Sequence, residues 1–417
     1  MMTLSTDLRI HHRPRLNVRI LGLLCTVLLL GGAPALADPI EQVLGMAQAS
    51  LVVGPAQHRL ISHHADTPMI PASTMKLVTA LAAIERWGLA HRFSTELWLD
   101  AEQRLWIKGS GDPYLVAEEL DRLVQALVPT LAQQGLKHLS GLGLDDTLYA
   151  SDLRVPGRSR TNNPYDAPLS ALAVNFNTVN LQIDSIGIRS GEPQTPLTAT
   201  GQRLGAGLAA GRHRLNLGTR AQALHHFAEV LTIKLEQAGI QIDATAPIIA
   251  PVPASARSLY RYANSQPLEQ TLRDMLKYSN NFVANNLFLL LGEQHGHSSF
   301  PQAQRYMEHW VQQRFGWRTA RIEDGAGLSR GNRLSGAQII DLLGAMAPYR
   351  ALLPEQDAAP GVRAKTGTLS GVSCYAGFVK RPQGWIPFSL MINQAAPYQL
   401  RRQLALALVH APSLERR

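Results

Sequence analysis

Segments with apolar residues at helical spacing alternate along this chain with short apolar runs that predict strands. Two such runs, at residues 51–54 and 58–61, precede an amphipathic segment that continues to about Trp87. Further helices are predicted over residues 268–277, 282–291, 302–315, 335–346 and 397–410. Strands are predicted near the other end of the chain, at residues 374–380 and 386–394. We therefore expect a sheet that draws strands from both ends of the chain and carries helices on its faces.

The middle of the chain has its own series of predicted strands and helices. Strand-like pieces at residues 94–99 and 105–108 precede an amphipathic helix over residues 118–134. Residues 184–218 are rich in Gly, Thr, Pro and Arg, which favours hairpins or loops. We interpret residues 93–239 as a smaller α/β domain inserted into a larger one.

The N-terminus has the pattern of a targeting segment. Four arginines precede an apolar run at residues 20–30, and Ala35-Leu36-Ala37 provides a small-residue cleavage site. The apolar run is short for a membrane span. We predict a cleaved signal peptide over residues 1–37, export to the periplasm, and no integral membrane span in the mature chain.

Composition and charge narrow the possible functions. The 417 residues are 45% hydrophobic with a net charge of +9, which falls to +6 when the signal peptide removes four arginines and Asp7. No run of Lys and Arg interleaved with aromatic residues is present, which argues against nucleic acid as a partner. Only Cys374 remains after cleavage, so no internal disulfide can form. The histidine pairs of the chain lack companion ligands at metal spacing, and we predict neither a metal nor a cofactor.

Three short motifs carry the candidate chemistry. In chain order they are Ser73-x-x-Lys76, Ser279-Asn280-Asn281 and Lys365-Thr366-Gly367. Each motif alone is weak, but the three in this order are typical of penicillin-binding proteins and active-site serine β-lactamases.

The residue types of the first two motifs suit nucleophilic catalysis. Ser73 can attack a carbonyl carbon and form an acyl-enzyme, with Lys76 one helical turn away as its proton acceptor. Ser279 can relay a proton to the departing amine. Asn281 can hydrogen-bond both Lys76 and the substrate amide.

The third motif suits the binding of a carboxylate. Lys365 adds a positive charge that recruits the carboxylate and helps to hold the neighbouring lysine neutral. The hydroxyls of Thr366 and Thr368 can bind the same group, and Gly367 lets a substrate backbone lie close to the strand. The backbone N–H groups of Ser73 and Thr368 would form an oxyanion hole.

The chain resembles the class C low-molecular-mass penicillin-binding proteins, the serine D-alanyl-D-alanine carboxypeptidase/endopeptidase family. Further matches are Gly109-Ser110-Gly111-Asp112-Pro113, Leu144-Asp145-Asp146, Tyr165-Asp166-Ala167-Pro168, Asp324-Gly325-x-Gly327-Leu328-Ser329-Arg330 and Lys365-Thr366-Gly367-Thr368-Leu369-x-Gly371. The resemblance implies an α+β fold: a penicilloyl-serine-transferase (β-lactamase-like) catalytic domain over residues 38–92 and 240–417, with an antiparallel sheet flanked by helices. It also implies cleavage of D-Ala-D-Ala termini, D-Ala-diaminopimelate cross-links, or both, in peptidoglycan peptide stems, with β-lactam antibiotics as covalent inhibitors.

Three departures from the family pattern leave alternatives open. Residues 184–218 are short for the family's third nested domain, which we expect to be reduced or absent. Ala326 stands where the family usually has a serine. Tyr278-Ser279-Asn280 also fits the Tyr-x-Asn motif of class C β-lactamases, a frame that would make Tyr278 the catalytic group. The alternatives to a peptidase are a serine β-lactamase and a non-catalytic peptidoglycan-binding protein.

Overall fold

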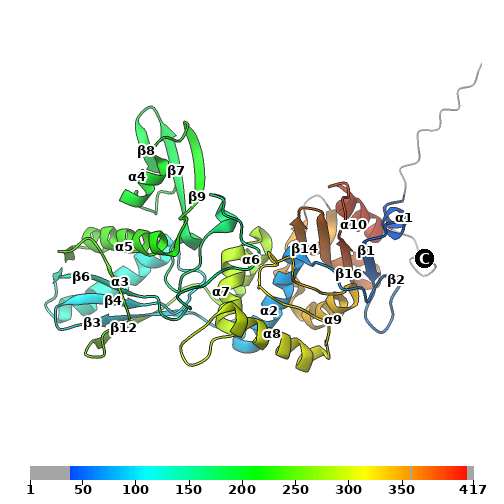
Figure 1. Ribbon diagram of the computed structural model, residues 1–417, viewed down its shortest axis with the longest axis horizontal. Helices are drawn as coiled ribbons and strands as arrows, with labels where there is room; N and C mark the ends of the chain where they lie inside the picture. The colour runs from blue at the N-terminus through cyan, green and yellow to red at the C-terminus, as the bar shows by residue number, and fades with distance from the viewer. Residues whose placement is uncertain (1–37, 357–358, 411–417) are drawn as a thin grey trace, which may run out of the picture. The chain divides into compact units, whose positions relative to one another are not determined.

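One antiparallel sheet joins the two ends of the described chain (Figure 1). The computed structural model describes residues 38–356 and 359–410, so the predicted signal peptide over residues 1–37 lies outside the described residues. In spatial order the six strands are β13 (Glu355–Gln356), β14 (Ala359–Leu369), β15 (Val372–Arg381), β16 (Gly384–Ile392), β1 (Ala49–Val53) and β2 (Ile61–His63). Strand β1, the first in the sequence, pairs with β16, the last, and Ala49 lies opposite Ile392. The expectation of a sheet built from both ends of the chain is confirmed.

Helices cover both faces of this sheet, because both faces carry apolar side chains. All five positions of β1 are buried: Val52 faces one core, while Leu51 and Val53 face the other. The first core is covered by α2 (Met75–Trp87), α6 (Leu268–Tyr278), α7 (Asn281–Leu291), α8 (Phe300–Phe315) and α9 (Gly336–Met346). The second is covered by α1 (Pro39–Leu44) and α10 (Leu400–His410), on the far side of the sheet from α2 in Figure 1.

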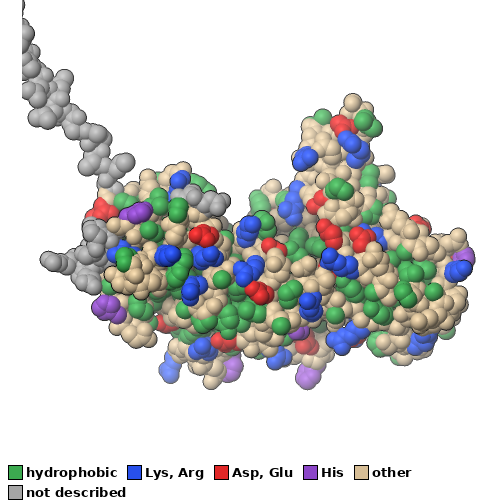
Figure 2. All heavy atoms as spheres, turned by 180° about the vertical axis from the view of Figure 1, so that it is seen from behind, with side chains coloured by type: hydrophobic (Ala, Val, Ile, Leu, Met, Phe, Trp, Pro, Cys, Tyr) green, Lys and Arg blue, Asp and Glu red, His purple; other side chains and the backbone are tan. Residues whose placement is uncertain are grey.

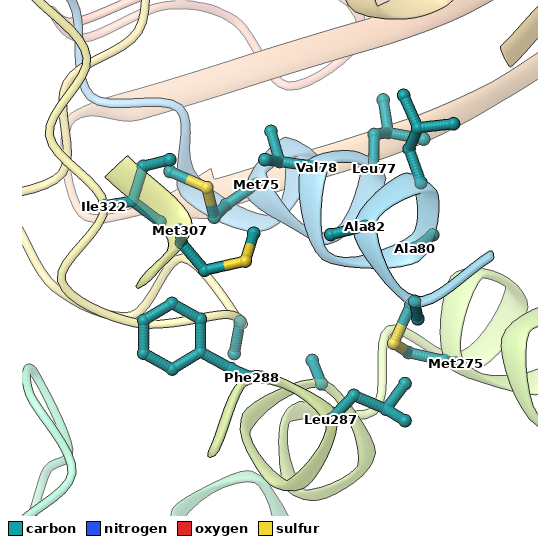
Figure 3. Close-up of a cluster of buried hydrophobic side chains, with 14 of the residues drawn as sticks. Met75, Leu77, Val78, Ala80, Ala82, Met275, Leu287, Phe288, Met307 and Ile322 are labelled. Carbon is teal, nitrogen blue, oxygen red and sulfur yellow. The ribbon is translucent and has the colours of Figure 1, made fainter. Parts of the chain in front are cut away.

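Helix α2 lies at the centre of the larger core. Ten consecutive residues, from Met75 to Ile84, are buried, as expected for a helix with neighbours on every side. Figure 3 shows Phe288 of α7 and Met307 of α8 pointing into this core, together with Met75 and Ile322. The helix that carries Lys76 of the first motif is therefore held rigidly by packing.

A second, mixed sheet organises the middle of the chain. In spatial order its strands are β11 (Ile248–Ile249), β6 (Gly141–Asp145), β4 (Arg104–Lys108), β3 (Ser94–Leu99) and β12 (Arg257–Ala263). Helices α3 (Ala117–Gln133) and α5 (Arg220–Gln237) pack on it around a separate apolar core. A two-stranded parallel ladder, β5 (His138–Leu139) with β10 (Gln241–Ile242), adjoins them. Strand β12 pairs with β3 and so belongs to this sheet, although it lies after residue 239, the predicted end of the insert. The boundaries of the insert stay a prediction.

A third, small sheet takes two of its three strands from residues 184–218, the segment expected to form hairpins or loops. Its strands are β7 (Thr178–Asp184), β8 (Gly187–Ser190) and β9 (Gly211–Asn216), with β7 in the middle. A seven-residue helix, α4 (Ala199–Gly205), was not predicted, because two glycines and a threonine make its sequence a poor helix former. The Thr198 side chain caps it by accepting from the N–H of Gly201, and Leu204 packs against the core of the small sheet. Whether this sheet is the remnant of a nested domain stays a prediction.

Surface charge is mixed on the face that Figure 2 shows, where Lys and Arg side chains lie among acidic ones rather than in one continuous stripe.

Among the described residues, no helix combines the length and the apolar character that a membrane crossing needs.

The position of Phe288 predicts a large loss of stability on truncation. Its buried ring packs within the core around α2, so Phe288→Ala should lower the free energy of unfolding by about 3–5 kcal/mol. Urea unfolding followed by circular dichroism measures this change. The control is Ile186→Ala, at an exposed side chain, which should stay within about 0.5 kcal/mol of the parent. Equal effects of the two substitutions would contradict the assigned core.

Candidate active site

Ser73 lies in a tight turn that leads directly into α2. The turn is a short 3-10 helix, η1 (Ala72–Thr74), in which Thr74 Oγ1 donates to the carbonyl oxygen of Pro71 at 2.7 Å. Ala72 has a φ of +46°, a conformation uncommon for a residue with a Cβ atom. Such strain is found mainly where the surrounding structure imposes it, often next to functional groups. The serine thus precedes the first residue of α2 and is not part of its regular helix.

The side chain of Lys76 brings the first and second motifs together. Its Nζ lies 3.2 Å from Ser73 Oγ and donates to Asn281 Oδ1 at 2.8 Å. It also donates to the carbonyl oxygen of Ala326 at 2.8 Å. The side chain is completely buried, and none of the ion pairs of the described residues includes it.

These surroundings favour the neutral amine. Burial and the nearby charge of Lys365 hold the pKa of Lys76 well below its usual range, with Asp324 acting in the opposite direction. A neutral amine has two N–H donors and one lone pair. Because the oxygens of Asn281 and Ala326 accept the two donors, the lone pair is left to face the hydroxyl of Ser73. The arrangement can therefore remove the serine proton.

The second motif forms the turn between α6 and α7. Ser279 ends α6 with a φ of +55°, and the side chain of Asn280 caps α7 by accepting from the N–H of Val283 at 3.2 Å. Asn281 Nδ2 donates to the carbonyl oxygen of Tyr165 at 3.1 Å, which orients the oxygen of the same amide toward Lys76. The lysine thus contacts Asn281, while Asn280 has a capping role. The Tyr278 side chain is 69% exposed.

A cavity of about 400 Å³ opens beside this turn. Its lining residues are Tyr114, Pro164, Tyr165, Phe176, Thr178, Arg214, Asp274, Met275, Tyr278, Ser279, Asn280, Asn281 and Val283. Both Ser279 and Asn281 therefore line a space that can hold part of a ligand.

The third motif lies on β14 and packs against the serine turn. A Cβ atom added to Gly367 would lie 2.9 Å from both the carbonyl oxygen of Pro71 and the backbone nitrogen of Ser73. The glycine is therefore required by the chain's own turn, a reason different from the substrate contact expected from the sequence. Lys365 is 2% exposed, and its Nζ donates to the carbonyl oxygen of Thr366 at 2.7 Å.

Lys365 and Arg401 place positive charge at the third motif. Burial, with a further contribution from Arg401, lowers the pKa of Lys365 to about 7. The hydroxyl of Thr368 accepts a hydrogen bond from Arg401 Nη1 at 2.8 Å. Thr368 itself is exposed, so its hydroxyl remains accessible to a ligand.

A loop after α8 supplies the second acceptor for Lys76. The buried carboxylate of Asp324 accepts from the backbone N–H groups of Ala326, Leu328 and Ser329 at 3.0–3.1 Å. It also accepts from Asn332 Nδ2 at 2.7 Å. Since Lys76 contacts the backbone oxygen of Ala326, this contact does not depend on the side chain at that position. The substitution noted in the sequence leaves it intact.

Several groups of the site could not be found from the sequence. The carbonyl oxygens of Ala326 and Tyr165 act through the backbone, which leaves no trace in residue type. Arg401 lies outside every motif. The described residues contain no group of three or more His, Cys, Asp or Glu side chains placed to hold a metal ion.

The fold and this meeting of three motif segments define a class. A helical core and an antiparallel sheet hold a serine, a buried lysine, an Asn-bearing turn and a Lys-Thr-Gly strand together, as in penicillin-binding proteins. The family model described as D-Ala-D-Ala carboxypeptidase 3 (S13) matches residues 35–204, 204–353 and 348–411. The chain belongs to this family, and it is therefore a serine-type DD-peptidase.

Individual relatives agree with the family. The chain is 29% identical to a D-alanyl-D-alanine carboxypeptidase of Actinomadura sp. (strain R39), over 91% of this chain and 87% of the relative. The crystal structure of penicillin binding protein 4 from Haemophilus influenzae matches with a TM-score of 0.71 and 20% identity, covering 89% of this chain and 97% of the other. The same protein complexed with a β-lactam matches with a TM-score of 0.65 and 19% identity, with the same coverage. The fold class and the family resemblance expected from the sequence are confirmed.

The role of Asp324 predicts that its removal destabilises the protein. In Asp324→Ala, the backbone N–H groups of Leu328 and Ser329 would lose their acceptor, whereas Ala326 N–H and the Asn332 amide each keep a second one. Each N–H group left unsatisfied costs about 1–3 kcal/mol, so the free energy of unfolding should fall by at least about 2 kcal/mol. The exposed Asp152 provides the matched control, for which Asp152→Ala should be nearly neutral in the same urea titration. An Asp324→Ala variant as stable as this control would disprove the structural role.

Proposed function

We propose that the chain cleaves peptidoglycan peptide stems through an acyl-enzyme on Ser73. The bond cleaved is that of D-Ala-D-Ala termini, that of D-Ala-diaminopimelate cross-links, or both. The observation that supports this most directly is the environment of Lys76. Its amine has two carbonyl acceptors and one serine hydroxyl as neighbours, is buried, and takes part in no ion pair of the described residues. A serine so placed next to a neutral amine is an activated nucleophile.

The acylation step follows from this geometry. Ser73 Oγ attacks the carbonyl carbon of the scissile amide, and its proton passes to the Lys76 amine. The oxyanion that develops is stabilised by the backbone N–H groups of Ser73 and Thr368. The proton then passes to the leaving amine, with the hydroxyl of Ser279 as relay, and the C–N bond breaks. A water molecule hydrolyses the resulting ester and regenerates Ser73.

The third motif and Asn281 position the substrate. Lys365 supplies positive charge for the carboxylate of the leaving residue, and the hydroxyls of Thr366 and Thr368 hydrogen-bond it. Asn281 holds Lys76 through its oxygen, and lines the cavity in which the acyl part of the substrate can lie. The observed contact of Lys76 with Asn281 supports the serine frame of the second motif over the frame that uses Tyr278.

A periplasmic location and β-lactam inhibition complete the proposal. The predicted signal peptide supports export, and peptidoglycan is then within reach. A β-lactam offers a strained amide to Ser73 in place of the peptide bond. The β-lactam complex of the Haemophilus influenzae protein concerns a chain of the same fold, which supports a ligand of this kind here.

Labelling with a fluorescent penicillin tests the nucleophile. The parent protein should form a long-lived adduct that is visible after denaturing electrophoresis, and Ser73→Ala should form none. The exposed Ser151 provides the control, because Ser151→Ala should label like the parent. Fast turnover of the penicillin without an adduct would favour a β-lactamase. Absence of both labelling and turnover in the parent would favour a non-catalytic peptidoglycan-binding protein.

The two lysines predict a bell-shaped pH dependence of kcat/KM for a peptide that ends in D-Ala-D-Ala. On the acid side, kcat/KM should rise with pH as Lys76 loses its proton, beginning well below the usual lysine range. On the alkaline side it should fall above about pH 7, because Lys365 of the free enzyme then loses the charge that binds the carboxylate. Lys365→Arg should move this alkaline limb to higher pH, since arginine stays protonated.

The exposed Lys380 serves as the matched control for this profile, and Lys380→Arg should leave both limbs in place. An alkaline limb at the same pH in Lys365→Arg and in the parent would show that another group causes it.

A further inference from the structure

The C-terminal part of the chain carries positive charge alone around the third motif. Between Asp357 and Glu415 the sequence contains six Lys and Arg residues and no Asp or Glu. This stretch includes β14, β15, β16 and α10. A ligand carboxylate that approaches Thr366 and Thr368 therefore meets no acidic side chain from these elements.

Arg401 lies outside the third motif in the sequence, but its side chain contacts Thr368, the residue that directly follows the motif. It lies near the start of α10, which packs against β14 and β15. Its Nη1 donates to Thr368 Oγ1 at 2.8 Å, and its guanidinium carbon lies 4.7 Å from the centroid of the Tyr398 ring. These two contacts hold the guanidinium beside an exposed hydroxyl.

The guanidinium of Arg401 keeps unused binding capacity. A guanidinium has five N–H donors, and the bond to Thr368 uses one of them. None of the ion pairs among the described residues includes Arg401. Its charge acts on the site, because it contributes to the lowered pKa of Lys365. A planar pair of donors beside Thr368 matches the geometry of a carboxylate.

We propose that Arg401, together with Thr368, binds the free α-carboxylate of the leaving D-residue. The enzyme thereby cleaves peptides whose leaving residue has a free carboxylate in preference to peptides whose leaving residue is amidated. This inference rests on the proposed peptidase function and adds a specificity-determining residue to it. The carboxylate is present in the substrate and in the transition state alike. Loss of Arg401 should therefore raise KM for such a substrate more than it lowers kcat.

The test compares two peptides, an N-acylated tripeptide that ends in D-Ala-D-Ala and the same tripeptide with a C-terminal amide. The parent should cleave the acid with a higher kcat/KM than the amide. Arg401→Ala should lower kcat/KM for the acid by roughly 10- to 100-fold, mainly through KM, and leave the amide almost unchanged. Arg401→Lys should recover part of the preference for the acid, because it restores the charge without the planar pair of donors.

Controls separate this inference from its alternatives. Arg402→Ala removes the same charge from the next residue of α10, an exposed one, and should keep the parent's preference for the acid. If Arg401→Ala slowed both peptides equally, the residue would only support Thr368 or the packing of α10, and the inference would be overturned. An unchanged acid-to-amide ratio would overturn it as well. Failure of the parent to cleave either peptide or to label with penicillin would instead contradict the proposed function.

Discussion

The burial of the Lys76 amine, which no described carboxylate contacts in an ion pair, is the constraint on which the site depends. A charged ammonium group in such a place is unfavourable, so the protein stabilises the neutral form of Lys76. Two carbonyl oxygens then accept its N–H groups, and Ser73 is the remaining neighbour. The burial that favours the neutral amine and the contacts that orient it are provided by the same packed core.

Close approaches of the backbone assemble the site around this amine. A Cβ atom at Gly327 would lie 1.8 Å from the carbonyl oxygen of Ala72, and one at Gly367 would lie 2.9 Å from Ser73. The loop and the strand can thus approach the serine turn because both positions lack side chains. Thr79 of α2 binds the carbonyl oxygen of Gly325 and fixes the loop from the other side. Distant segments of the chain meet at one turn through steric fit.

Much of the fold could be predicted because its signals are local. Apolar periodicity placed α6 to α10 and the strands β15 and β16, and the family resemblance supplied the way they assemble. The short α4 was missed because its sequence has low helix propensity and its stability comes from packing on the small sheet. The pairing of β12 with β3 was missed as well, since partners about 160 residues apart leave no local pattern.

The sequence by itself determined which side chains are candidates for the reaction: motif order predicts Ser73, Lys76, Asn281 and Lys365, because each chemical role demands a particular side chain. Only the tertiary structure decided what surrounds them. The oxygens of Ala326 and Tyr165, the packing of Gly367 against the serine turn, and the reach of Arg401 to Thr368 depend on where the backbone runs. Backbone carbonyls are common to all residues, and an arginine is common on surfaces. Their significance therefore comes from position in space, which residue type does not encode.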